Sequence, residues 1–239
     1  DIVLRGYNSP EYIKDCGTPK RLDKVCAHFE SELILKSNLR FPQKIIFLDR
    51  DGTVNRSVDQ LSQIDDFELL PGVAQAIAQI NQAGYRAVVV TNQPVIARGE
   101  CTYEQLEAIH RKMQTLLGEH GAYLDRIYYC PHHPDKGFAG EVLELKKVCE
   151  CRKPGIGMLN QAKLELNADL SASWMIGDST ADILAGHAAG VNTILLETGQ
   201  AGMDEKYPVI PSHISTNLST AVHFILYEYP KLLKRCELW

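Results

Sequence analysis

Two aspartates stand two positions apart where a buried strand should end. Residues 44–49 read KIIFLD, an apolar run typical of a strand in a parallel sheet, and Asp51 and Gly52 follow directly. If the strand gives way to a loop after Asp49, both carboxylates can point into one pocket, one as nucleophile and the other as proton donor and acceptor. Paired acids are also common in solvated turns, so this pair does not by itself establish catalysis.

A second group of residues combines three cysteines with a histidine. Cys130 and His132 are two positions apart, and so are Cys149 and Cys151. Residues at i and i+2 project to the same side of an extended segment, so two such pairs can close a tetrahedral Zn²⁺ site. Four protein ligands predict a structural zinc ion, with buried free cysteines as the alternative. His133 breaks the pairing and is the weaker ligand candidate.

These residues need a regular framework, and the sequence predicts one. Short apolar runs alternate with helical patterns, and Gly84, Gly121 and Gly190 stand where helices should end. This alternation is typical of a doubly wound α/β fold, in which ligands bind beyond the carboxyl ends of the parallel strands. The predicted strands are residues 44–49, 86–91, 126–130, 173–177 and 193–197, and the predicted helices are residues 72–83, 102–118, 155–167 and 180–189.

The first 40 residues do not join this alternation. A turn-rich stretch through Pro19 precedes one predicted helix over about residues 20–36, and we place a domain boundary near residue 41. The sequence therefore predicts an N-terminal extension, residues 1–40, and an α/β domain, residues 41–239. A last predicted helix, about residues 217–228, packs on the sheet as its closing element.

Composition excludes several classes of protein. The 239 residues are 45% hydrophobic and 23% charged, as in soluble globular proteins, and no apolar run approaches the roughly 20 residues that cross a bilayer. A net charge of −5 offers no general attraction for nucleic acid or anionic membranes, so we expect neither as a partner. The N-terminus lacks a hydrophobic signal segment, which predicts a cytoplasmic location. Because the first residue is Asp, we expect an excised fragment or a processed product.

Four motifs in order resemble the haloacid dehalogenase (HAD) superfamily of phosphotransferases. They correspond to Asp49 with Asp51 in DRDGT, Thr91 with Asn92, Lys153 in CRKP, and Asp178 in GDSTAD. Each stands at the predicted edge of one sheet, and the resemblance covers about residues 44–200. It implies a Rossmann-like parallel sheet with helices on both faces, a small zinc-bound loop and no large cap domain.

The resemblance also implies a two-step reaction. Asp49 would attack phosphorus to form an aspartyl-phosphate while Asp51 protonates the leaving oxygen, and Asp51 would then activate water to hydrolyse this intermediate. Thr91 and Asn92 would hold the phosphoryl oxygens, and Lys153 would provide a fixed cation. Mg²⁺ would be held by Asp49, Asp178 and the backbone carbonyl of Asp51. Because Asp51 must alternate between acid and base, we expect burial to raise its pKa toward neutrality.

The cysteine pattern narrows the resemblance to the D-glycero-D-manno-heptose 1,7-bisphosphate phosphatases. DRDGT, TNQ, CPHHP and CRKP occur in this order, and residues 96–99 (IARG) match the substrate-contacting loop of the heptose branch. The implied reaction is Mg²⁺-dependent removal of the C7 phosphate in activated-heptose biosynthesis. We expect Gln93, Arg98 and Arg152 to bind the sugar phosphate, with one or both arginines holding its second phosphate.

The extension carries a separate resemblance. Residues 12–19 (YIKDCGTP) are similar to the D-x-G-T-P segment near the end of sugar nucleotidyltransferase domains. This similarity predicts that residues 1–40 are the remnant of such a domain, fused to the phosphatase in the native chain. A turn that leads into a helix explains the same residues, and Asp15 receives no catalytic role.

Two other functions stay open at this point. Histidinol-phosphate phosphatases share the motif order, and turnover of the two substrates would separate the families. A non-enzymatic, zinc-stabilised binding module is the alternative from another class. It predicts no Mg²⁺-dependent phosphate release.

Overall fold

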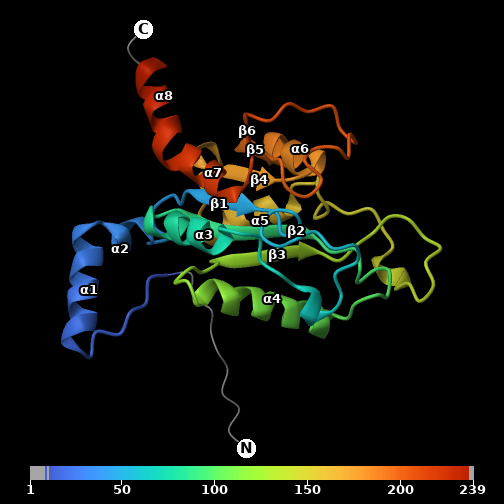
Figure 1. Ribbon diagram of the computed structural model, residues 1–239, viewed down its shortest axis with the longest axis horizontal. Coiled ribbons are helices and arrows are strands. Elements are labelled where there is room, and N and C mark those ends of the chain that lie inside the picture. Colours follow the sequence, from blue (N-terminus) through green and yellow to red (C-terminus); the bar gives the residue numbers. More distant parts are fainter. Residues whose placement is uncertain (1–8, 10, 237–239) are drawn as a thin grey trace, which may run out of the picture.

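A six-stranded parallel sheet forms the centre of the molecule (Figure 1). The computed structural model describes residue 9 and residues 11–236. In the sheet, β1 and β4 lie in the middle of the order β3-β2-β1-β4-β5-β6, and every neighbouring pair is parallel. The strands are β1 (Ile45–Leu48), β2 (Arg86–Asn92), β3 (Arg126–Cys130), β4 (Trp174–Gly177), β5 (Asn192–Leu196) and β6 (His213–Ser215). The predicted doubly wound α/β fold is confirmed.

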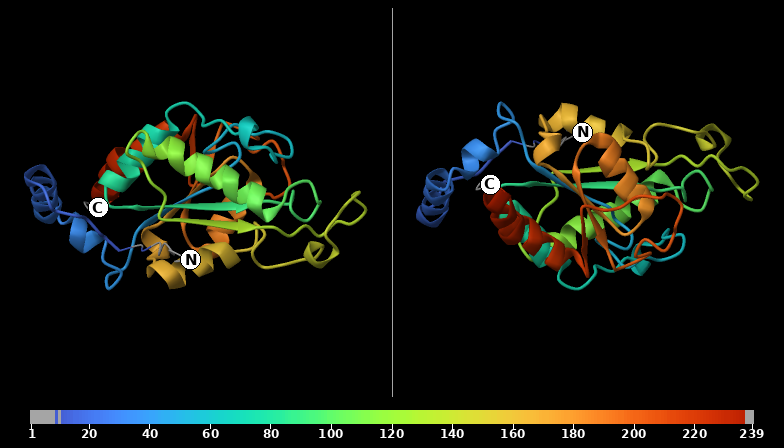
Figure 2. Two further views of the ribbon diagram at one scale, coloured as in Figure 1. Left: turned by 90° about the horizontal axis from the view of Figure 1, so that it is seen from below. Right: turned by 90° about the horizontal axis from the view of Figure 1, so that it is seen from above.

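Helices cover both faces of the sheet, as Figure 2 shows. The side chains of β1 alternate between the faces: Ile46 and Leu48 pack in one apolar cluster, and Ile45 and Phe47 in another. The first cluster is closed by α3 (Val73–Gln82), α4 (Tyr103–Gly118) and α7 (Leu218–His223), and the second face is covered by α5 (Gly157–Leu166) and α6 (Thr180–Ala189). Because both faces are covered, every residue of β1 is buried.

The register brings three chain segments to one edge of the sheet. Leu48 of β1 pairs with Val89 of β2 and with Ile176 of β4. Because these neighbours are parallel, the residues that follow β1, β2 and β4 emerge side by side. This edge therefore gathers three of the predicted motifs.

The segments inserted at this edge contain little regular secondary structure. Within the described residues, the connection from β1 to α3 carries a single 3-10 turn, Ile64–Asp66, and the connection from β3 to α5 carries another, Leu143–Leu145. The second connection, which contains the predicted zinc ligands, extends beyond the carboxyl edge of the sheet (Figure 1). Among the helices of residues 9 and 11–236, none combines the length and apolar character needed to cross a bilayer.

Two predicted helices need correction, and one strand was not predicted. The helix over residues 20–36 is two helices, α1 (Pro19–Glu30) and α2 (Leu33–Lys36), because Glu32 adopts a left-handed conformation with φ 58°. The last helix does not end near residue 228: α7 runs through a π-helical turn, Phe224–Glu228, into α8 (Tyr229–Cys236). Trp174 stacks edge-on against Phe224 and Tyr229 and holds this continuation on the sheet. Strand β6 was not predicted, because three residues after a Gly- and Pro-containing stretch carry too little pattern.

The N-terminal helices stand apart from the sheet (Figure 1). Neither α1 nor α2 has a buried residue. The chain joins the α/β core over residues 37–43, where the Arg86 guanidinium donates to the carbonyl of Ser37 and the Gln43 amide donates to the carbonyls of Asn38 and Phe41 at 2.9 and 2.8 Å. The packing contacts of the core therefore begin close to the predicted boundary.

Candidate active site

Three carboxylates meet where β1 and β4 end. Asp49 follows β1, Asp178 follows β4, and Asp182 lies in the first turn of α6. One carboxylate oxygen from each lies within 4.8 Å of the others. The sequence placed Asp49 and Asp178 at this edge but assigned Asp182 no role, although it completes the GDSTAD motif.

Two stretches of backbone fix the carboxylate of Asp178. Gly52 has φ +83°, and a Cβ atom there would lie 2.2 Å from Asp178 Oδ2, so a larger residue would collide with the carboxylate. From the other side, the backbone N–H of Gln200 donates to the same oxygen at 2.7 Å. The glycine of DRDGT is therefore required for close approach of the two loops.

Lys153 lies among these carboxylates with all three of its N–H groups near an acceptor. Its Nζ is 2.8 Å from Asp49 Oδ1, 2.6 Å from Asp182 Oδ1 and 2.8 Å from the carbonyl of Val90. Asn92 holds the lysine's backbone, because its side chain accepts from the Lys153 N–H at 2.9 Å and donates to the Lys153 carbonyl at 3.0 Å. The end of β2 thus positions the cation.

The carboxylates carry more negative charge than one lysine balances. Burial and the Asp182 carboxylate raise the pKa of Asp49 to about 7, and burial and Asp49 raise that of Asp178 to about 8. Burial lowers the pKa of Lys153, but Asp182 and Asp49 outweigh it and the net pKa is raised. A set of clustered carboxylate oxygens that resists ionisation fits a hard divalent cation.

Asp51 is held by donors from three residues. The Arg50 Nη2 lies 3.0 and 2.9 Å from its two oxygens, Asn55 Nδ2 donates to Oδ1 at 2.9 Å, and Gln93 Nε2 donates to Oδ2 at 2.9 Å. Burial alone would raise the pKa of Asp51, but the Arg50 charge and these hydrogen bonds outweigh it and lower the pKa below its usual value. The expectation of a pKa raised toward neutrality is therefore wrong for this conformation.

The three predicted substrate-binding residues lie in different surroundings. Arg152 lines the pocket, and its Nη1 also donates to the carbonyl of His132 at 3.4 Å. Gln93 is buried, and its amide is bonded to Asp51, Arg50 and Thr91. Contact of Gln93 with substrate stays a prediction.

Arg98 packs against residues 133–138, in the connection that carries the predicted zinc ligands. Its guanidinium lies 4.8 Å from the centre of the Phe138 ring, and its Nη2 is 3.4 Å from His133 Nε2. Lys146 Nζ lies 4.3 Å from the same ring, so Phe138 contacts two cations. Contact of Arg98 with substrate also stays a prediction.

A pocket of about 230 Å³ opens over the carboxylates. Such a volume fits the phosphorylated end of a small metabolite. Of the predicted residues it is lined by Asp49, Asp51, Thr91, Asn92, Arg152, Lys153 and Asp178, and of the residues that we did not predict by Ser57, Pro94, Ser179, Ala181, Asp182, Gln200, Asp204, Lys206 and Tyr207. Four of the second group come from residues 199–211, which the sequence marked only as a stretch containing Gly and Pro.

Asp204 attaches that segment to the site. Its carboxylate accepts the backbone N–H of Thr180 at 2.9 Å and the Thr180 hydroxyl at 2.6 Å, at the start of α6. The Tyr207 N–H donates to the same hydroxyl at 3.3 Å. The neighbouring Lys206 is thereby brought to the pocket wall.

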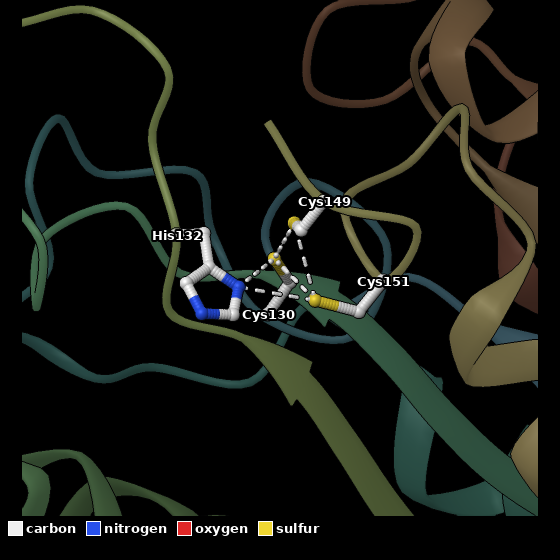
Figure 3. Close-up of side chains that lie close together, drawn as sticks. All are labelled: Cys130, His132, Cys149 and Cys151. Atoms are coloured by element: carbon white, nitrogen blue, oxygen red, sulfur yellow. Dashed lines mark hydrogen bonds between the residues drawn. The ribbon is translucent and has the colours of Figure 1, made fainter. Parts of the chain in front are cut away.

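The predicted zinc ligands come together, as Figure 3 shows. The three sulfur–sulfur distances among Cys130, Cys149 and Cys151 are 3.0, 3.3 and 3.5 Å, and His132 Nδ1 lies 3.2 Å from Cys151 Sγ. Zinc–sulfur bonds of about 2.3 Å in a tetrahedron place sulfur atoms about 3.8 Å apart, so a small expansion admits the ion. His133 is outside this set, because its Nδ1 accepts the N–H of Asp135.

The comparisons with known proteins agree with this geometry. Residues 150–221 match a family model described as "HAD-hyrolase-like". The fold is likewise similar to that of a protein from Mesorhizobium loti described as a "putative had-like phosphatase", with a TM-score of 0.65 at 32% identity over 77% of this chain and 88% of that one.

Named relatives identify the family. The D-glycero-beta-D-manno-heptose-1,7-bisphosphate 7-phosphatase of Escherichia coli (strain K12) is 41% identical over 191 residues, 80% of this chain and 93% of that protein. The enzyme of the same name from Yersinia pestis is 47% identical over 156 residues, 65% of this chain and 81% of that protein. This chain therefore belongs to the D-glycero-beta-D-manno-heptose-1,7-bisphosphate 7-phosphatase family.

A solved structure supports the same assignment. The D,D-heptose 1,7-bisphosphate phosphatase from B. bronchiseptica, complexed with magnesium and phosphate, superposes with a TM-score of 0.66 at 33% identity. The match covers 81% of this chain and 99% of that one.

Proposed function

We propose that this chain hydrolyses the C7 phosphate of D-glycero-D-manno-heptose 1,7-bisphosphate in a Mg²⁺-dependent reaction of activated-heptose biosynthesis. The observation that carries the proposal is the position of Asp49: it lies at the pocket floor, ion-paired to Lys153 and beside Asp178. The choice of substrate rests on the family to which the chain belongs. Histidinol phosphate is the second candidate, because its phosphatases share the motif order.

The residues of the pocket divide the chemistry between them. A carboxylate oxygen of Asp49 attacks phosphorus, so that an O–P bond forms as the bond from phosphorus to the C7 oxygen breaks, and the leaving oxygen takes a proton from Asp51. In the second step Asp51 removes a proton from water, the water oxygen bonds to phosphorus, and the bond to Asp49 breaks. The carboxylate form of Asp51 suits the second step. The approach of a phosphate dianion raises its pKa for the first.

Mg²⁺ at this site would be held by Asp49, Asp178 and the backbone carbonyl of Asp51, with Asp182 beside them. It would supply positive charge for the phosphoryl oxygens. The magnesium- and phosphate-bound relative and the clustered oxygens support this placement. Lys153 contributes the protein's own positive charge at the same point.

The second phosphate of the substrate binds, in our proposal, at the Arg152 side of the pocket. Arg152 offers a planar fork that binds phosphate oxygens in pairs, and Lys206 lines the same pocket. Lys153 interacts with the phosphoryl group that is transferred. Arg152 and Lys206 can therefore bind the second phosphate.

We further propose that Cys130, His132, Cys149 and Cys151 bind a structural zinc ion. Arg152 and Lys153 follow the last ligand directly, so the ion would hold the segment that carries both cations. The ligand set has no open position for substrate.

Residues 1–40 form, in our proposal, an extension with kinship to a sugar nucleotidyltransferase, outside the phosphatase domain. The absence of buried residues in α1 and α2 supports this division. A variant lacking residues 1–36 should keep kcat/KM within about twofold, because none of the described residues that line the pocket belongs to this segment. A large loss of activity would contradict the boundary.

Phosphate release separates the candidate functions. We expect heptose bisphosphate to be turned over with a kcat/KM at least a hundredfold above that of histidinol phosphate, with no activity in EDTA. Asp49→Asn should abolish turnover with little change in stability, because the amide keeps the shape and removes the nucleophile. A preference for histidinol phosphate would contradict the proposed substrate. An active Asp49→Asn variant would contradict the proposed mechanism. A binding module would release no phosphate.

A further inference from the structure

We propose that His110 is a positioning residue: acting through Arg50, it holds the carboxylate of Asp51 in place for proton transfer. The inference deepens the proposed function and rests on it, because it assigns Asp51 the proton-transfer role. His110 lies on α4, outside every motif identified in the sequence.

Arg50 is fully buried, so each of its N–H groups needs an acceptor. Nη2 lies 2.9 and 3.0 Å from the oxygens of Asp51 and 3.0 Å from Gln93 Oε1, and Nε is 3.3 Å from Asp51 Oδ1. Nη1 lies 3.2 Å from His110 Nε2. His110 therefore provides the acceptor for the outer arm of the guanidinium.

The direction of this hydrogen bond is fixed by chemistry. A guanidinium can only donate, so His110 Nε2 must accept and its proton must lie on Nδ1. An acceptor is essential at this point, because a buried, charged N–H without one is costly. If Arg50 lost this acceptor, its rotation toward another partner would break the hydrogen bonds that its guanidinium makes to Asp51.

The helix that carries His110 is a rigid support. Thr102 and Gln105 form a capping box at the start of α4, and the helix buries Ile109, Met113 and Leu117 against the sheet and Leu106 against the loop that follows β2. The His110 ring is 6% exposed and lies 5.7 Å from the Tyr129 ring. The guanidinium is thus held between Gln93 at the end of β2 and a well-packed helix.

This arrangement affects only steps in which Asp51 transfers a proton. Cleavage of a sugar phosphate expels a strongly basic alkoxide, which needs that proton, whereas p-nitrophenyl phosphate expels a weakly basic phenolate that needs it little. The parameter kcat/KM reports the first irreversible step, attack by Asp49. A misplaced Asp51 should therefore lower kcat/KM for the sugar substrate selectively.

Two variants at position 110 test the inference in the full-length, Mg²⁺-loaded enzyme. His110→Phe keeps a planar ring without an acceptor, and we expect kcat/KM for heptose bisphosphate to fall ten- to thirtyfold while that for p-nitrophenyl phosphate falls less than threefold. His110→Gln places a carbonyl oxygen within reach of Arg50 and should keep both values within threefold. If His110→Phe does not fold, His110→Met serves as the variant without the ring acceptor.

Three results would overturn the inference. An equal loss on both substrates would show a structural role, an unchanged kcat/KM would remove His110 from the mechanism, and a His110→Gln enzyme as impaired as His110→Phe would exclude the acceptor role. Failure of the proposed substrate would be seen in the wild-type enzyme instead, and the same comparison can then be made with whichever alkyl phosphate that enzyme hydrolyses.

Discussion

Replacing Lys153 by Met removes the charge between Asp49 and Asp182 while keeping the length of the side chain. The Lys153 side chain is 2% exposed, and its Nζ lies 2.8 and 2.6 Å from the two carboxylates. Breaking a buried ion pair costs about 3–5 kcal/mol when the remaining charge stays unpaired. The raised pKa values of Asp49 and Asp178, about 7 and 8, let these carboxyls take up protons near neutral pH and reduce that cost. We therefore expect a loss near the lower limit, about 3 kcal/mol, in EDTA at pH 7.

A loss of this size is measurable by thermal unfolding. For a chain of this length, 1 kcal/mol shifts Tm by about 2–4 °C, so Lys153→Met should lower Tm by about 6–12 °C in EDTA. Saturating Mg²⁺ should restore much of this stability, because the metal supplies positive charge to the same carboxylates. Lys163→Met, on the exposed face of α5, is the matched control and should change neither stability nor activity.

Activity should not recover with the metal. Loss of one fixed positive charge beside the phosphoryl group that is transferred lowers kcat about 10²- to 10³-fold. The Mg²⁺ that is already present cannot replace the charge of Lys153. Steady-state phosphate release at saturating Mg²⁺ measures this. A Lys153→Met enzyme with more than a tenth of wild-type kcat, or with wild-type Tm in EDTA, would refute the reasoning.

Three further expectations concern the second phosphate, the zinc ligands and acid stability. Arg152→Ala should lower kcat/KM for the bisphosphate about ten- to a hundredfold and that of a small monophosphate ester much less; equal losses would contradict a second phosphate site. Metal analysis should find about one zinc ion per chain, and Cys149→Ser should lower both zinc content and Tm; a metal-free protein of unchanged Tm would contradict the ligand set. Burial and Arg50 lower the pKa of His110 to about 3, so the unfolded chain binds its proton more tightly, and stability is lost as pH falls below about 6.5. Between pH 7 and 5 the wild type should lose about 2 kcal/mol of unfolding free energy more than His110→Gln, and parallel losses in urea denaturation would exclude this contribution.

Most of the sheet could be predicted because its strands are buried on both faces. Ile45–Leu48 are four consecutive apolar residues, so both faces of the strand are apolar. This pattern predicts a central strand of a parallel sheet. The same argument places β2, β4 and β5. Strand β6 was not predicted because three residues are too few to show a strand pattern. Its extended conformation is stabilised by pairing with β5.

In the candidate site too, residues in local motifs could be predicted, and residues brought in by distant parts of the chain could not. The approach of Asp49 and Asp178 and the clustering of Cys130, His132, Cys149 and Cys151 could be predicted, because spacing within a motif and position after a strand are local properties. The partners of Asp51 could not all be found this way. His110 is 60 positions from Arg50, and the residues of the 199–211 segment reach the pocket through contacts such as Asp204 with Thr180. The lowered pKa of Asp51 follows from the charge of the adjacent Arg50 and from the hydrogen bonds of Asn55 and Gln93, since burial alone would have raised it.

The position of the phosphate that is released tests the central proposal most directly. ³¹P NMR of D-glycero-D-manno-heptose 1,7-bisphosphate, incubated with wild-type enzyme and Mg²⁺, follows the C7 and C1 resonances separately. We expect the C7 signal to decay into inorganic phosphate while the C1 signal persists in heptose 1-phosphate, and no change with Asp49→Asn. Loss of the C1 signal first, or persistence of both signals with active wild-type protein, would contradict a 7-phosphatase.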